Sequence, residues 1–352
     1  MAERVTGGLP SFPHDNWLVS LPKAEVHVHL EGTLGARELV VLAEQEGQAL
    51  PRPETELFEV GNLADFLELL DWGCALVRTQ EQLSDAAYRL SQREAGSGVL
   101  YADVIVNPTH WRSWRGRLGD MVEALDVGFT RAERDGYPPV GLCLSLLRQQ
   151  SAQEAMNLVR WMASSAPPRV VALSIDGNEA AAGPTAQRFA PAFAAARAAG
   201  FHCAAHAGES SGPEGVWDAI DVLGVERVDH GVRAVEDAAL VGALAERGLP
   251  LGMCPTSNLK LGVCVSYEAH PLERLRRAGV KVSVNSDDPA LLGTSLELEY
   301  QRVGEPACWG IAEYLQVAGF SIDAAFCPER AKASMRRQLA AFAAASRGKE
   351  RT

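Results

Sequence analysis

Hydrophobic residues along this chain gather in short runs, and longer segments of helical periodicity separate these runs. The short runs are rich in valine, leucine and alanine, which is typical of buried strands in a parallel sheet. The predicted strands cover residues 24–30, 99–106, 140–145, 170–175, 202–206, 227–230, 249–254 and 281–285. The clearest predicted helices cover residues 36–46, 62–79, 80–95 and 184–199, with one or two terminal helices over 321–345.

Three of the predicted helix starts carry a capping box, in which Ser or Thr is followed three residues later by Glu or Gln. These pairs are Thr79 with Gln82, Ser151 with Glu154, and Ser211 with Glu214. Pro213 lies close to the first helical position of the last pair, where proline is favoured. The pattern therefore places helices directly after residues 79, 151 and 211.

Eight strands that alternate with helices predict a parallel sheet covered by helices, and the simplest closed form is a (β/α)8 barrel. Two helices in the connection between the first two strands predict an inserted lid. An open doubly wound sheet is the alternative fold, but neither GxGxxG nor GxxxxGK[ST] follows the first strand. We expect a single barrel domain over residues 18–345, an N-terminal segment over 1–17 and a polar tail over 346–352.

Composition and charge exclude some classes of binding partner. The chain has 352 residues and a formal net charge of -12, which disfavours nucleic acid and anionic membrane surfaces. No apolar run approaches the length of a membrane span, and residues 1–20 lack the pattern of a secretory signal. Its seven cysteines are scattered without CxxC pairs, which predicts reduced thiols and a cytoplasmic location. The sequence gives no indication of the oligomeric state.

Candidate chemistry lies at the predicted strand ends. His27 and His29 fall on one face of the first strand, because side chains in a strand repeat with a period of two. Taken alone, this pair fits two partly buried structural histidines as well as metal ligands. However, His206 and His230 end the fifth and sixth strands, and Asp287 follows the eighth. Strand ends converge at the carboxyl face of a barrel, so these side chains are expected to meet.

Three histidines and one carboxylate suit a borderline-soft divalent ion, and we expect one catalytic zinc ion per chain. The expected ligands are His27, His29, His206 and Asp287. His230 would then remain to accept a proton from a metal-activated water, and Glu209 would be able to give a proton to a substrate. Glu209 also fits a helix-start acid, and Asp288 before Pro289 also fits a helix N-cap. The remaining histidines are expected to be surface or packing residues: His14, His110, His202 and His270.

Five segments in the same order closely resemble the adenosine/adenine deaminase family of the zinc amidohydrolase superfamily. They cover residues 22–32, 206–209, 229–231, 254–255 and 285–289, and the resemblance extends over residues 18–300. It implies a hydrolase in which hydroxide adds at C6 of a 6-aminopurine and ammonia leaves. It also implies that His230 orients the hydroxide and that Glu209 protonates a ring nitrogen. Asp288 would accept a hydrogen bond at or near N7, and the backbone N–H of Gly177 would reach the ring.

The substrate cues conflict. Nucleoside deaminases of this family usually carry Asp two residues after the second metal histidine, where it contacts the ribose, whereas this chain has Glu31. The extra methylene would crowd a sugar, and residues 254–260 also resemble the adenine group. Residues 176–179 (Asp-Gly-Asn-Glu) are closer to the adenosine type. A small-molecule purine of the adenine type is favoured, with adenosine, an N6-substituted adenine and aminodeoxyfutalosine as alternatives.

Other functions are compatible with part of the same residue pattern. A barrel hydrolase of another class is one alternative, but two-metal members often use a carboxylated lysine, and none lies near the end of the fourth strand. A zinc-binding relative without activity is another, which the retained acids and histidines disfavour. The combined H-x-E…P-C-x-x-C arrangement of cytidine-type deaminases is absent. Trp111 and Trp114 could stack on a purine or pack within a loop, and Phe66, Leu67, Leu70 and Trp72 could line a lid or the core.

Overall fold

Eight parallel strands follow one another around a single sheet in a computed structural model that describes residues 17–61 and 63–349. The strands are β1 (Lys23–His29), β2 (Val99–Val106), β3 (Val140–Leu147), β4 (Val170–Asp176), β5 (His202–Ala207), β6 (Arg227–His230), β7 (Leu251–Met253) and β8 (Val282–Val284). All eight predicted strands are present, and all of their ends lie within two residues of the predicted ends.

Backbone contacts beyond β8 bring the last strand back to the first. Val28 forms a parallel bridge with Asp287, the His29 N–H donates to the Asp287 carbonyl at 2.7 Å, and the Asp287 N–H donates to the His27 carbonyl at 3.2 Å. This seam confirms the predicted (β/α)8 barrel and rules out the open doubly wound alternative. These main-chain bonds also place the segment of His27 and His29 beside Asp287, so two segments that carry candidate ligands are adjacent.

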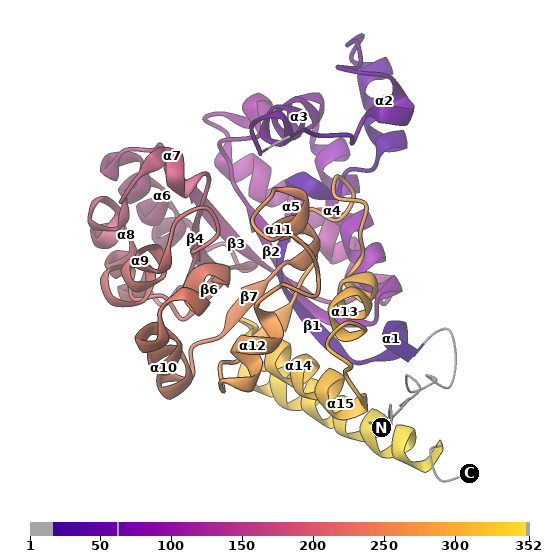
Figure 1. The fold of residues 1–352 in the computed structure, drawn as a ribbon. Coiled ribbons are helices and arrows are strands. Elements are labelled where there is room, and N and C mark those ends of the chain that lie inside the picture. The colour runs from indigo at the N-terminus through magenta and orange to yellow at the C-terminus, as the bar shows by residue number, and fades with distance from the viewer. Residues whose placement is uncertain (1–16, 62, 350–352) are drawn as a thin grey trace, which may run out of the picture.

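Helices surround the sheet (Figure 1). They are α1 (Trp17–Ser20), α2 (Ala36–Gln45), α3 (Leu63–Leu76), α4 (Gln80–Gly96), α5 (Leu118–Arg134), α6 (Ala152–Ser165), α7 (Glu179–Ala182), α8 (Ala186–Ala198), α9 (Pro213–Trp217), α10 (Ala238–Arg247), α11 (Pro255–Lys260), α12 (Leu272–Arg277), α13 (Leu296–Gly304), α14 (Ile311–Ala324) and α15 (Glu329–Lys349). The extra helices between the first two strands and at the C-terminus are both confirmed. Within the described part of the chain, no helix is long and apolar enough to cross a membrane.

The two C-terminal helices close one end of the barrel. α14 packs against β1 and β8 and lies beside α15 along the lower edge of Figure 1. α15 continues through Lys349, into the stretch where a polar tail was expected, while residues 350–352 lie outside the described part. Residues 1–16 of the expected N-terminal segment lie outside it as well.

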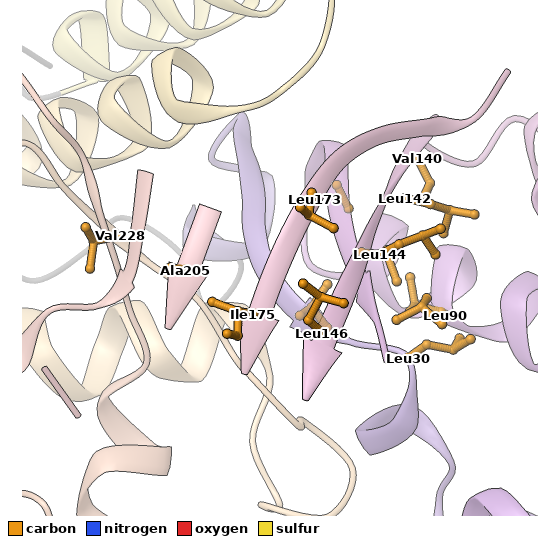
Figure 2. Close-up of a cluster of buried hydrophobic side chains, with 14 of the residues drawn as sticks. Leu30, Leu90, Val140, Leu142, Leu144, Leu146, Leu173, Ile175, Ala205 and Val228 are labelled. Carbon is orange, nitrogen blue, oxygen red and sulfur yellow. The ribbon is translucent and has the colours of Figure 1, made fainter. Parts of the chain in front are cut away.

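Strand alternation divides the buried residues between two faces. Leucines and valines at every second position of β3 and β4, such as Leu142, Leu144 and Leu173, pack under the surrounding helices (Figure 2). Burial of each leucine of this kind stabilises the folded state by about 1.5–3 kcal/mol. The opposite face carries small residues, and Cys143 and Ala172 lie there in a cluster within the barrel. Small side chains inside the barrel leave room for the polar groups that the strands carry further along.

One such polar group is a fully buried ion triad. The Arg227 guanidinium donates to Asp103 at 2.7 Å and to Asp229 at 2.9 Å, and none of the three side chains is exposed. Asp229 Oδ1 lies 4.0 Å from His27 Nδ1, so the triad reaches toward the candidate metal ligands.

Two of the three predicted capping boxes are present. Thr79 and Ser151 each accept from the backbone N–H three residues later. The prediction at Ser211 is wrong, because α9 begins at Pro213 with Gly212 as its N-cap. The Ser211 hydroxyl donates instead to the carboxylate of Glu179, the first residue of α7, at 2.7 Å.

Candidate active site

The four predicted metal ligands converge at the carboxyl end of the barrel. His27 Nε2 lies 3.1 Å from His206 Nε2 and 3.1 Å from Asp287 Oδ1. His29 Nε2 lies 2.9 Å from the same nitrogen of His206 and 3.4 Å from the same oxygen of Asp287. Three imidazole nitrogens and one carboxylate oxygen therefore face a common point, and they come from β1, β5 and the segment after β8.

His230 belongs to the same cluster. Together with His27, His206 and Asp287, it offers ligand atoms that all lie within 4.8 Å of one another. Its Nε2 is 4.0 Å from Asp287 Oδ2, farther than the contacts that His29 makes. His29 Nε2 therefore lies closer to the Asp287 carboxylate than His230 Nε2 does.

The electrostatics of the cluster fit a bound cation. Burial opposes ionisation of Asp287, but the surrounding histidines, His27 first, hold the pKa of its carboxyl well below the usual range. Burial lowers the pKa of His29 to about 4, and burial together with the neighbouring imidazoles holds the pKa of His206 well below its usual value. Neutral imidazoles offer lone pairs, and a buried carboxylate needs a nearby positive charge. This donor set fits a divalent metal ion.

The raised pKa of His27 indicates the same need for positive charge. Burial works against the charged form, yet the Asp287 and Asp229 carboxylates raise the pKa of His27 to about 9. His27 Nδ1 lies 3.0 Å from the Gly252 carbonyl, which fixes the ring orientation and leaves Nε2 directed at the cluster. Such an orienting contact to the second ring nitrogen is usual for metal-binding histidines.

Two residues of the cluster have left-handed backbone conformations. His230 has φ of 68° and Asp287 has φ of 62°, values that L residues other than glycine rarely adopt. Regular strand alternation would direct His230 away from Asp229, so the unusual φ allows its ring to join the site. Backbone strain of this kind often marks functional positions.

Glu209 lies beside His230 on the loop that follows β5. Its Oε1 is 3.6 Å from His230 Nε2, and its side chain lines the same cavity. Burial raises the pKa of Glu209, which favours the protonated form that a proton donor needs. Because α9 begins only at Pro213, the alternative assignment of Glu209 as a helix-start acid is not supported.

Asp288 also lines the cavity and depends on a glycine for its position. A Cβ on Gly32 would lie 2.0 Å from Asp288 Oδ1, so only glycine allows this close approach. Burial, with Asp287 and Glu31 nearby, raises the pKa of Asp288 well above its usual value. The turns after Pro289 are not helical, and the next helix begins at Leu296, so the N-cap alternative does not apply.

Glu31 presents one carboxylate oxygen to the protein, and the other has no partner. Its Oε1 accepts from the Asn107 backbone N–H and from Trp111 Nε1, each at 2.7 Å. Its Oε2 has no hydrogen-bond partner among the described residues, and burial raises the pKa of the carboxyl to about 7. Trp111 is thus fully buried behind Glu31, while Trp114 donates to the Val77 carbonyl, and neither is among the described residues that line the cavity.

The cavity above the cluster has a volume of about 280 Å³. Helix α3 contributes Phe66, Leu67 and Leu70 to its wall, and the predicted Gly177 lies there with φ of 96°. Pockets for drug-sized ligands usually measure about 300–1,000 Å³, so this cavity suits a small molecule.

His110 was predicted to be a surface or packing residue, and this prediction is wrong. It lines the cavity, with its Nδ1 held 2.7 Å from Asp71 Oδ1 on α3. Its place just after β2, at the carboxyl end of the barrel, was the available signal. His202 pairs with Glu226 at the surface and His270 is buried, as predicted, whereas His14 lies outside the described residues.

Comparisons with known proteins give the same picture. The sequence model of the family described as Adenosine deaminase matches residues 22–342. The adenine deaminase of Rhodospirillum rubrum is 36% identical over 342 residues, which cover 94% of this chain and 98% of that protein. The crystal structure of an adenine deaminase from Arthrobacter aurescens aligns with a TM-score of 0.86 at 29% identity, covering 92% of this chain and 99% of that chain. An amidohydrolase from Burkholderia ambifaria with bound Zn aligns with a TM-score of 0.86 at 28% identity, covering 98% and 97%.

Proposed function

Because the chain belongs to the adenosine/adenine deaminase family, we propose that it hydrolyses the 6-amino group of adenine and releases ammonia. The observation that carries this proposal is the cluster of histidines and Asp287 at the base of a small cavity, with Glu209 beside it. Similarity to adenine deaminases over nearly the whole chain supports the same substrate class.

Zinc is the metal that we propose for the cluster, one ion per chain. The proposed ligands are His27, His29, His206 and Asp287, and a structural relative contains Zn. Histidine nitrogens with one carboxylate are a usual zinc donor set. When bound, zinc would lower the pKa of a coordinated water toward neutrality and so supply hydroxide at working pH.

The other roles follow from position and protonation. Glu209 holds a proton near the substrate, since burial raises its pKa, and gives that proton to the purine ring nitrogen next to C6. His230, 3.6 Å from Glu209, accepts a proton and orients the attacking oxygen. Asp288 lies on the cavity wall and pairs with the N7 side of the ring, while the backbone N–H of Gly177, directly after β4, reaches the ring.

The preference for the free base rests on Glu31. Its unpartnered Oε2 supplies an acceptor in a buried wall, and adenine carries an N9–H donor that a nucleoside lacks. A buried acceptor that a ligand leaves unpaired costs about 1–3 kcal/mol, so the site favours the ligand that can donate. The cavity volume of about 280 Å³ is consistent with a base.

The direct experiment is ammonia release by zinc-loaded protein, with kcat/KM measured for adenine and adenosine in one assay. We expect clear turnover of adenine and a preference for it over adenosine. Preference for adenosine would refute the role given to Glu31 and would make the Gly177 segment the dominant substrate determinant. Absence of turnover with both, at full zinc content, would refute the deaminase proposal for these substrates.

A further inference from the structure

The Glu179 carboxylate collects five hydrogen bonds from a single loop. This residue starts α7, yet its side chain reaches the loop after β5. Its Oε1 accepts from the Gly208 N–H at 3.1 Å and from the Ser211 hydroxyl at 2.7 Å. Its Oε2 accepts from the backbone N–H groups of Glu209, Ser210 and Ser211 at 2.9, 3.1 and 3.2 Å. Four successive N–H groups therefore converge on one carboxylate.

Convergent backbone N–H groups of this kind form an anion-binding concavity, and here the anion is part of the chain. Glu179 is only 5% exposed, so water does not easily replace it as an acceptor. In the opposite direction, the Glu179 N–H donates to the Ser210 hydroxyl at 3.1 Å. The loop after β4 and the loop after β5 are thus joined by bonds in both directions.

Arg148 balances the buried negative charge. Its Nη2 lies 3.7 Å from Glu179 Oε1 and donates to the carbonyl of His206, the candidate metal ligand that precedes the loop. Its Nη1 donates to the Thr185 hydroxyl at 2.8 Å. The Glu179 carboxylate is therefore both paired with a cation and hydrogen-bonded, as a buried carboxylate requires.

Capping of its own helix does not explain Glu179. Asn178 is the N-cap of α7, and its side chain accepts from the Ala181 N–H at 2.9 Å. The Glu179 carboxylate is therefore directed away from the first turn of its helix. All five donors belong to residues 208–211, and the second of these residues is Glu209.

We propose that Glu179 is a positioning residue that fixes the Glu209 backbone, so that the Glu209 side chain lies at the substrate. This inference rests on the proposed function, in which Glu209 is the proton donor. Glu179 itself lies behind the loop and touches no reacting atom. Its contribution is geometric, since a displacement of about 1 Å in a catalytic group can cost about 10²-fold in rate.

Glu179→Gln tests the proposal. An amide has one acceptor oxygen, so its NH2 group must face either the two donors now on Oε1 or the three on Oε2. We expect kcat with adenine to fall by about 10- to 100-fold, with KM within about twofold of the wild-type value and the zinc content unchanged. Glu214→Gln is the matched control, because Glu214 accepts from the neighbouring Gly212 N–H from an exposed position, and it should keep the wild-type kcat.

A double-mutant cycle with Glu209→Gln separates positioning from a general structural role. If Glu179 acts through Glu209, Glu179→Gln causes no further loss of kcat in the Glu209→Gln background. An equal loss in both backgrounds, a large rise in KM or a loss of zinc would overturn the inference. Wild-type turnover of Glu209→Gln alone would instead identify a failure of the proposed function, and the inference would fall with it.

Ser211→Ala is the milder variant, to be used if Glu179→Gln does not fold. It removes one of the five donors and leaves the carboxylate in place. We expect a fall in kcat of about threefold to tenfold at unchanged KM, which should again disappear in the Glu209→Gln background. An unchanged kcat in Ser211→Ala would contradict the positioning role.

Discussion

Glu31→Gln tests the proposed hydrogen bond between the Glu31 carboxylate and the N9–H group of adenine. The variant keeps an oxygen that can accept from Asn107 and Trp111, so the supporting contacts survive. It replaces the unpartnered Oε2 by an NH2 group, which would face the N9–H of adenine donor to donor. A hydrogen bond to a charged acceptor is worth about 1.5–3 kcal/mol, and each 1.36 kcal/mol is a factor of ten in rate.

We therefore expect kcat/KM for adenine to fall by about 10- to 150-fold in Glu31→Gln. The value for adenosine, which has no hydrogen on N9, should change much less, so the ratio of the two substrates is the measured quantity. Glu68→Gln is the control, because Glu68 lines the exposed side of the same cavity and should leave the ratio unchanged. A wild-type ratio in Glu31→Gln would refute the assignment. Glu31→Asp, which withdraws the carboxylate by one methylene, should shift preference toward nucleosides.

Glu31→Gln should also change how the free energy of unfolding depends on pH. Burial raises the pKa of Glu31 from 4.5 to about 7 in the folded state. Between these values the unfolded chain loses this proton while the folded chain retains it, so the wild type loses stability as pH rises through this window. At 1.36 kcal/mol per pKa unit the loss is about 3 kcal/mol, and glutamine, which does not titrate, avoids it. Urea unfolding at pH 4.5 and pH 7.5 should show that the free energy of unfolding of Glu31→Gln increases relative to that of the wild type as pH rises. An equal difference at both pH values would contradict the shift.

Three further variants test the rest of the site and its support. Asp287→Asn keeps a residue that tolerates the left-handed backbone but removes the charge, and it should lose both metal and turnover, as measured by metal analysis and ammonia release; full metal content would dismiss Asp287 as a ligand. Glu209→Gln should lower kcat by about 10²- to 10⁴-fold with metal still bound, and wild-type rates would remove it as the proton donor. Arg227→Met leaves Asp103 and Asp229 as unpaired buried charges and should cost about 3–5 kcal/mol in urea unfolding. Adding Asp103→Asn and Asp229→Asn should recover most of that loss, and no recovery would contradict the charge argument.

The sequence by itself determined the barrel and the positions of its chemistry. Apolar runs of strand length, separated by helical periodicity, depend on local patterning, and all eight strands followed from them. The placement of His27, His29 and His206 also followed, because a period of two and the carboxyl-end rule need only the strand assignments. Such features are repeated along the chain, so a linear pattern can reveal them.

Only the tertiary structure decided which partner each polar side chain takes. Ser211 carries a valid capping-box spacing, yet its hydroxyl bonds to Glu179, a residue 32 positions earlier. Trp111 supports Glu31 instead of lining the cavity, and His110 lines the cavity although it lies in a loop. His230 enters the site through a left-handed φ that no periodicity predicts. A buried donor or acceptor bonds to whatever group folding brings within about 3 Å, and that proximity is a property of the closed barrel and not of sequence spacing.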